Sequence, residues 1–341
     1  MPNQTSLAQE WLEKTNQAAT PEEQIHCCNQ ALELDPEFAL AYFYRGNCYV
    51  GLHQYAEAIA DYDRALRLDP KMDGALINRG ICHAHLHQYE EAVGDHSQAI
   101  RINPENAEPY YFRGNCLFQL EKYEDAIGNF DQALRLDPEF AAAYNNRGLC
   151  YSNLDQDEKA IEDYNQAARL APENASVFYD RGTSYAVLRQ HEKAIEDFTR
   201  AISLEPDFGD AYYNRGNCYG HLKRFEKAIE DYSQSIRLDP DDAYAYNNRG
   251  FTYANLGQYE KAVEDCDRAL SLDPELEDAC YNKACACAHL GKMEDALSNL
   301  RQALRIAPHK YCDQAKDEPA FEAIRGDAVF RELLEINCAE C

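Results

Sequence analysis

Small and aromatic residues recur along the chain at helical spacing, in paired segments separated by polar turns. In residues 210–239, the first segment places Tyr212, Gly216 and Tyr219 at positions i, i+4 and i+7, and the second repeats this spacing over residues 228–235. Such spacing predicts two amphipathic helices. Because Gly216 has no side chain, it lets the two helices approach closely, and the aromatic residues fill the space beside it.

The paired segments repeat with a fixed period. Nine prolines lie 34 residues apart, at Pro36, Pro70, Pro104, Pro138, Pro172, Pro206, Pro240, Pro274 and Pro308. Between them, seven Arg-Gly pairs recur with the same spacing, from Arg45-Gly46 to Arg249-Gly250. A 34-residue period of paired helices predicts a chain of helical hairpin repeats.

At these positions the chain resembles the tetratricopeptide repeat (TPR) family. One unit meets the family pattern of aromatic, Gly, Tyr, Ala, aromatic, Ala and Pro in full, with Tyr144, Gly148, Tyr151, Ala160, Tyr164, Ala167 and Pro172. The resemblance spans residues 5–310. It implies an all-α fold, a right-handed α-solenoid or superhelix of helical hairpins, in which the first helices line a concave groove that holds partner proteins.

The ends of the array depart from the pattern. Residues 5–38 are expected to form a degenerate N-terminal TPR unit, because Trp11 and Leu12 stand where Arg-Gly is expected. Residues 39–310 then provide eight TPR units of 34 residues, and residues 311–341 are expected to form capping helices. Terminal repeats are often atypical, because one of their faces has no neighbouring repeat.

An acid follows the Arg of the Arg-Gly pair by 16 residues in six units. The pairs are Arg45 with Asp61, Arg79 with Asp95, Arg147 with Asp163, Arg181 with Asp197, Arg215 with Asp231 and Arg249 with Asp265. The arginines either bind an anionic partner or bridge the two helices of each hairpin. We expect bridges at a packed seam.

A second set of first-helix residues points away from the packing seam and is expected to line the groove. Asn recurs there, in one register at Asn78, Asn146, Asn214, Asn248 and Asn282, and in another at Asn47, Asn115 and Asn217. An Asn amide can pair with both polar groups of a peptide unit whatever its sequence. Similar TPR proteins grip peptide backbones through Asn, so the resemblance implies that role here; the alternative is that these Asn are solvated or bridge neighbouring hairpins.

Five Asn hydrogen bonds at about 0.5–1.5 kcal/mol each fall short of the roughly 8 kcal/mol of micromolar binding. Aromatic anchors are therefore expected to contribute, and the candidates are Phe43, Tyr111, Tyr179, Tyr213 and Tyr281. These rings could equally pack between hairpins.

The charge of the chain narrows the class of partner. With 60 Asp+Glu against 33 Lys+Arg, the formal net charge is -27, which disfavours nucleic acids and anionic membranes. The expected groove registers hold no Lys or Arg, so a clamp for a partner's C-terminal carboxylate is not expected. We expect a monomer that binds a neutral or basic extended segment of another protein. Without a membrane span or a signal peptide in the sequence, we expect it to be soluble and cytoplasmic.

Cysteine and histidine offer the remaining candidates for chemistry. Five of the 14 cysteines share one register, at Cys48, Cys82, Cys116, Cys150 and Cys218, as expected of small buried residues in a reducing compartment. The cluster of His83, His85, His87, Cys82 and His96 suggests a metal site, but alternate residues of a helix diverge. Neither a metal nor a cofactor is expected, and the C-x-x-C pair of Cys338 and Cys341 has no strand-helix context that would favour a redox or zinc site.

No nucleophile elbow, P-loop or dinucleotide fingerprint occurs in the sequence. We therefore expect a non-catalytic scaffold or adaptor that binds a peptide or protein segment in the groove. An alternative is a substrate-docking or regulatory subunit of an enzyme, such as a glycosyltransferase, supplied in trans. A third possibility is self-association through an uncapped end of the array.

Overall fold

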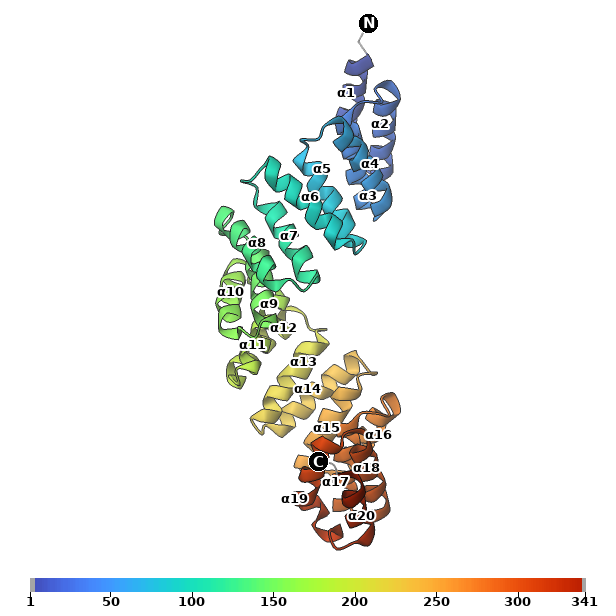
Figure 1. The fold of residues 1–341 in the computed structure, drawn as a ribbon, viewed down its shortest axis with the longest axis vertical. Helices are drawn as coiled ribbons and strands as arrows, with labels where there is room; N and C mark the ends of the chain where they lie inside the picture. The colour runs from blue at the N-terminus through green and yellow to red at the C-terminus, as the bar shows by residue number, and fades with distance from the viewer. Residues whose placement is uncertain (1–3, 339–341) are drawn as a thin grey trace. The chain divides into compact units, whose positions relative to one another are not determined.

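The computed structural model describes residues 4–338, which form helices joined by short turns, without a β-strand in that range (Figure 1). This confirms the predicted all-α class, a solenoid of helical hairpins. The chain forms two compact units, residues 1–172 and 173–341.

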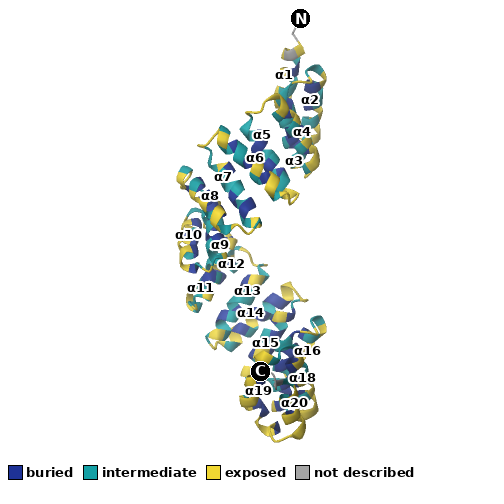
Figure 2. Cartoon of the chain, in the orientation of Figure 1, coloured by how far each residue is buried: buried dark blue, intermediate teal, exposed yellow. Residues whose placement is uncertain are grey.

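Five hairpins make up the first unit. Their helices are α1 (Gln4–Thr15), α2 (Pro21–Leu34), α3 (Ala39–Gly51), α4 (Tyr55–Leu68), α5 (Asp73–His85), α6 (Tyr89–Ile102), α7 (Ala107–Gln119), α8 (Tyr123–Leu136), α9 (Ala141–Asn153) and α10 (Asp157–Leu170). The first pair corresponds to the unit predicted to be degenerate. In Figure 2 buried and exposed residues alternate within each helix, as expected of helices that pack on one side.

Four hairpins and a terminal segment make up the second unit. The hairpin helices are α11 (Ala175–Val187), α12 (His191–Leu204), α13 (Gly209–His221), α14 (Phe225–Leu238), α15 (Ala243–Asn255), α16 (Tyr259–Leu272), α17 (Glu277–His289) and α18 (Met293–Ile306). The terminal segment contains α19 (Pro308–Asp317), the 3-10 helix η1 (Pro319–Ile324) and α20 (Ala328–Cys338). Tyr311, Phe321 and Phe330 are buried in one cluster with α17 and α18, so this segment covers the last hairpin.

Six of the hairpins close around a glycine and an aromatic ring. Tyr164 of α10 is 1% exposed, and its ring lies so close to Gly148 of α9 that a Cβ on Gly148 would come within 2.7 Å of Tyr164 Cε1. Real Cβ atoms do not approach other atoms so closely, so only glycine fits there. Gly46 against Tyr62 repeats this geometry in an earlier hairpin.

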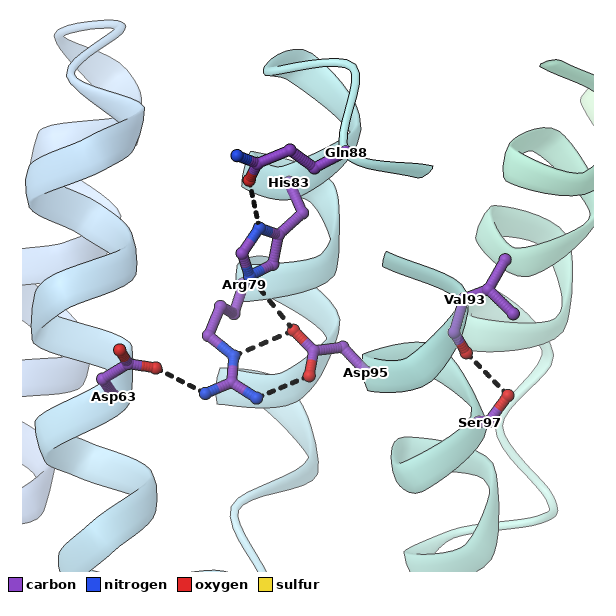
Figure 3. Close-up of polar contacts among 7 residues, drawn as sticks. All are labelled: Asp63, Arg79, His83, Gln88, Val93, Asp95 and Ser97. Carbon is purple, nitrogen blue, oxygen red and sulfur yellow. Dashed lines mark hydrogen bonds and ion pairs between the residues drawn. The ribbon is translucent and has the colours of Figure 1, made fainter. Parts of the chain in front are cut away.

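The predicted arginine pairs are bridges at the seam. Arg79 of α5 donates through Nε to Asp95 Oδ2 of α6 over 2.8 Å, and through a second guanidinium nitrogen to Asp95 Oδ1 over 2.5 Å (Figure 3). Its third nitrogen donates to Asp63 Oδ1 of the preceding hairpin over 2.5 Å. The bidentate pair recurs in all six predicted units: Arg45–Asp61, Arg79–Asp95, Arg147–Asp163, Arg181–Asp197, Arg215–Asp231 and Arg249–Asp265. The arginines therefore hold the two helices of a hairpin together.

Candidate functional site

In each unit the first helices of successive hairpins contact one another. In the first unit these helices are α3, α5, α7 and α9, and we call the surface they form the unit-1 face. In the second they are α11, α13, α15 and α17, which form the unit-2 face. The residues predicted to line a groove lie on these helices.

On the unit-1 face, the predicted Asn residues bond to each other across hairpins. Asn78 Nδ2 donates to Asn47 Oδ1 over 2.8 Å, and Asn146 Nδ2 donates to Asn115 Oδ1 over 2.7 Å. Asn146 Nδ2 also donates to the hydroxyl of Tyr111, 3.2 Å away. These amides stabilise the contact between neighbouring hairpins, which is the alternative role considered from the sequence.

The unit-2 face repeats this arrangement. Asn248 Nδ2 donates to the Tyr213 hydroxyl over 2.9 Å and to Asn217 Oδ1 over 3.1 Å. Asn214 Nδ2 donates to the Tyr179 hydroxyl over 3.0 Å. In the last hairpin, Asn282 Nδ2 donates to Asn247 Oδ1 over 2.9 Å.

The Asn side chains keep acceptor capacity toward an incoming chain. Among the described residues, nothing donates to the Oδ1 atoms of Asn78, Asn146, Asn214 or Asn282, and none of these atoms is both buried and unpaired. Each carbonyl can therefore accept a hydrogen bond from a ligand while its amide nitrogen stays bonded to the next hairpin.

The five predicted aromatic anchors contact rings of the same hairpin or of the segment that follows it. The ring-centroid distances are 6.0 Å for Phe43–Tyr62, 4.6 Å for Tyr111–Phe140, 4.7 Å for Tyr179–Phe208, 6.0 Å for Tyr213–Tyr232 and 4.4 Å for Tyr281–Tyr311. Phe43, Tyr111, Tyr179 and Tyr213 are half-buried, and burial raises the pKa of the Tyr179 and Tyr213 hydroxyls. Tyr281 is 3% exposed because the terminal segment covers it, so it offers little surface to a partner.

Two exposed aromatic residues of α15 were not among the site residues predicted from the sequence. Tyr244 is 58% exposed and Phe251 is 52% exposed. Phe251 lies 34 residues after Asn217, in the register already assigned to the groove, so extending that register to every unit would have found it. Phe251 lines a pocket of about 240 Å³ together with Asn217 and Asn248.

The unit-1 face contains two adjoining pockets. One, of about 310 Å³, is lined by residues of α5, α7 and α9 that include Asn115 and Asn146. The other, of about 340 Å³, shares Asn115 and is also lined by His96 and Phe112. On both faces, therefore, predicted Asn residues form part of a pocket wall.

Three acidic residues of these helices have different surroundings. Glu108 and Asp210 are exposed, so they can act on a partner's charge. Asp278, in contrast, accepts a hydrogen bond from the Tyr311 hydroxyl and pairs with Lys310 Nζ at 2.9 Å. Asp278 therefore helps to attach the terminal segment.

The histidines that suggested a metal have separate partners. His83 Nδ1 lies 2.7 Å from Gln88 Oε1, His85 stacks on Tyr55 at 4.5 Å, and His87 Nδ1 lies 2.9 Å from the Tyr89 hydroxyl. Within residues 4–338, no group of three or more His, Cys, Asp or Glu is placed to hold a metal ion.

The predicted cysteine register is buried in both units. Cys48, Cys82, Cys116, Cys150 and Cys218 are all free and buried. Burial raises the pKa of the Cys82, Cys116 and Cys218 thiols to about 11, so they are protonated and unreactive at neutral pH. The side chains of the Cys338 and Cys341 pair lie outside the described part of the structure.

None of the described helices has both the length and the apolar character that crossing a lipid bilayer requires.

Solved structures with the same fold include several TPR proteins. YrrB, described as a TPR protein with an unusual peptide-binding site, is 31% identical over 55% of this chain and 97% of its own, with a TM-score of 0.51. The C-terminal part of a TPR repeat-containing protein from Cytophaga hutchinsonii is 20% identical over 70% of this chain and 98% of its own, with a TM-score of 0.59. A tetratricopeptide repeat protein from Parabacteroides merdae is 18% identical over 72% and 97%, with a TM-score of 0.53. No curated protein matches the chain at a significant level.

Family profiles match the sequence along the array. Profiles described as tetratricopeptide repeat match residues 39–72, 86–128, 141–174, 175–208, 209–242, 243–276 and 277–310, and one described as TPR repeat matches residues 114–155. Together they cover more than half of the chain, which therefore belongs to the tetratricopeptide repeat family, whose fold generally serves as a non-catalytic scaffold for protein interaction.

Proposed function

We propose that this protein binds an extended, neutral or basic segment of another protein on its unit-1 and unit-2 faces. The observation that carries the proposal is on α15, where the exposed Phe251 borders a pocket lined by Asn217 and Asn248. An exposed aromatic ring beside hydrogen-bonding amides is the combination expected of a binding hot spot.

The Asn side chains support binding of a peptide backbone in one particular way. The Nδ2 groups of four of them already bond to neighbouring hairpins, so the carbonyl oxygens of these four are the groups available to a ligand. The four are Asn78, Asn146, Asn214 and Asn282. Those oxygens would accept backbone N–H groups of the bound segment, and the partner's sequence would be read by the pockets between them.

The charge of the faces supports a neutral or basic segment. Glu108 and Asp210 are exposed on α7 and α13, and burial followed by the nearby charge of Asp210 raises the pKa of the Tyr179 hydroxyl. A partner with acidic residues would be repelled there. YrrB, whose title describes a peptide-binding site in a TPR protein, is consistent with this use of the fold.

The scaffold would act as a cytoplasmic monomer and without catalysis of its own. The buried, protonated thiols of its cysteine register have no part in nucleophilic chemistry. A subunit that docks substrates for an enzyme supplied in trans would use the same faces, so it remains the second candidate.

The test is to select binding segments from a displayed library of random peptides with the full chain. Their affinities are then measured for the wild type, Phe251→Ala, and Leu238→Ala as a control. Leu238 is 37% exposed on α14, outside the unit-2 face. Phe251→Ala should weaken binding by about tenfold or more while Leu238→Ala changes it less than twofold. Equal effects of the two variants on every selected segment would refute the proposal.

A further inference from the structure

We propose that the adjoining pockets of the unit-1 face, between α5, α7 and α9, form a subsite for one tyrosine side chain of the bound segment. The inference rests on the proposed function and adds a side-chain preference to it. It is carried by the pocket lining, by the hydrogen bonds of Asn115 and by the surroundings of His96.

The lining of the subsite combines apolar side chains with the amides of Asn115 and Gln119. The two pockets, of about 310 and 340 Å³, share Ala84, Tyr89, Asn115, Cys116 and Gln119 in their walls. Neither wall contains an Asp, Glu, Lys or Arg residue. A charged side chain entering the subsite would lose its hydration without meeting an opposite charge, so the occupant must be neutral.

Asn115 lacks a hydrogen bond that its equivalents in other hairpins make. Asn47 Oδ1 accepts from the next hairpin's Asn78 and also from the Tyr62 hydroxyl, 2.7 Å away. Asn217 Oδ1 likewise accepts from the Tyr232 hydroxyl over 2.8 Å, as well as from Asn248.

In the hairpin of α7 and α8 the corresponding ring is Phe130, which has no hydroxyl. Asn115 Oδ1 therefore accepts only from Asn146 among the described residues. The hydrogen bond missing from this hairpin is one that a phenol hydroxyl makes in two others, and one of those phenols, Tyr232, lines the equivalent pocket beside Asn217.

His96 lies in the same wall, with its nitrogen-bearing edge packed against Gly80 of α5 and closed to solvent. It occupies the register of Tyr62 and Phe130, is 0% exposed, and neither of its ring nitrogens has a hydrogen-bond partner. The Tyr62 hydroxyl donates to Asn47 in its own hairpin. In the hairpin of His96 the residue equivalent to Asn47 is Ile81, whose side chain has no polar group. The imidazole is also smaller than a phenol, so it leaves space that the 340 Å³ pocket occupies.

Tyrosine supplies the hydroxyl that this hairpin lacks. Its hydroxyl can donate to Asn115 Oδ1 while its ring occupies the apolar part of the subsite. Phenylalanine has no group that could donate to this oxygen. The subsite therefore distinguishes tyrosine from phenylalanine by its hydroxyl.

The experiment titrates the full chain with N-acetyl-tyrosinamide and with N-acetyl-phenylalaninamide, monitoring methyl NMR signals. Ile81, Ala84 and Leu149 line the pockets and place methyl groups where binding is reported. Tyrosinamide should shift these signals and bind at least about threefold more tightly than phenylalaninamide, as expected when a hydrogen bond is gained. Equal affinity of the two probes, or shifts confined to other methyl groups, would overturn the subsite.

Phe130→Tyr is the matched variant, because it supplies Asn115 with the internal hydroxyl that Asn47 and Asn217 already have. It should keep the fold and make the affinities for the tyrosine and phenylalanine probes about equal. Asn214→Ala in the second unit should leave the preference for the tyrosine probe unchanged. A preference that survives in Phe130→Tyr and in Asn115→Ala, with both variants folded by their melting curves, would also overturn the proposal. If binding of the selected segments depends on Phe251 but does not require a tyrosine in the segment, the subsite is refuted and the proposed function stands.

Discussion

Arg113 Nε donates to Asn129 Oδ1 over 2.7 Å, at the position where six other arginines pair with a carboxylate. Another of its guanidinium nitrogens donates to the neutral hydroxyl of Ser97, 3.0 Å away, and the guanidinium lies over the ring of Tyr110. Arg113 is half-buried, and burial lowers the pKa of its guanidinium. This hairpin therefore contains a half-buried cation without the opposite charge that stabilises the equivalent arginines.

Asn129→Asp should stabilise the first unit by about 1–2 kcal/mol, because it gives Arg113 a charge-assisted bidentate partner. The measurement is the urea midpoint and melting temperature of the full chain at pH 7. Asn299→Asp is the control, since Lys283, which precedes it by the same 16 residues, already pairs with Asp267 at 2.7 Å. A gain no larger for Asn129→Asp than for Asn299→Asp would contradict this account.

Arg147→Ala should be strongly destabilising. The change leaves Asp163, whose side chain is 7% exposed, as a buried charge without its partner, which typically costs about 3–5 kcal/mol. The loss should diminish at acidic pH, because burial already raises the pKa of Asp163 and its protonated form carries no charge. Arg113→Ala serves as the comparison and should cost less, since its partner Asn129 is neutral. An unchanged melting curve for Arg147→Ala, with altered peptide binding, would place this arginine in a binding site instead.

The stability of the first unit should depend on pH through His96. Burial, followed by the charge of Arg113, lowers the pKa of His96 from 6.5 to about 4. The fold thus favours the neutral ring, and its contribution is fully present above pH 6.5. It is lost as the pH falls toward 4, because the unfolded chain takes up a proton that the folded chain does not. The loss between pH 7 and pH 5 should be about 2 kcal/mol.

His96→Phe isolates this effect, since Phe130 fills the same register in the next hairpin. Unfolding in urea at pH 7 and pH 5 should show a smaller decline for the variant than for the wild type. Parallel declines in the two proteins would mean that His96 is not the group responsible.

Glycine substitutions should separate packing from helix propensity. Gly148→Ala forces a Cβ to within 2.7 Å of the Tyr164 ring and should destabilise by about 1–3 kcal/mol. Gly94→Ala, on the exposed side of α6 with no atom within 4 Å of the added Cβ, should stabilise by about 0.5–1 kcal/mol. Melting temperatures that shift in the same direction for both variants would argue against the tight contact between Gly148 and Tyr164.

Much of the fold follows from the sequence because its determinants are periodic. The 34-residue spacing fixes which residues of successive hairpins are equivalent, and the offset of 16 residues from Arg79 to Asp95 is enough to predict their ion pair. These contacts lie within a hairpin, where helix geometry and a short turn leave few alternatives.

The candidate site depends on contacts that periodicity does not determine. Asn78 meets Asn47 across 31 residues, and the rotamers on two neighbouring helices decide whether its amide faces a hairpin or solvent. Tyr281 shares its register with the half-buried Tyr213, yet it is buried because the non-repeating terminal segment packs on it. The register of Phe251 could be predicted from the sequence, but its exposure depends on the surrounding side chains and could be assigned only from the structure.

The central claim is that a partner segment binds on the faces formed by the first helices. Site-specific photo-crosslinking tests it most directly, with benzoylphenylalanine placed at Phe251 on the unit-2 face or at Leu238 on α14, each incubated with a library-selected segment. We predict crosslinking at Phe251, competed by excess unlabelled segment, and background crosslinking at Leu238. Competed crosslinking at Leu238 without any at Phe251 would contradict the account.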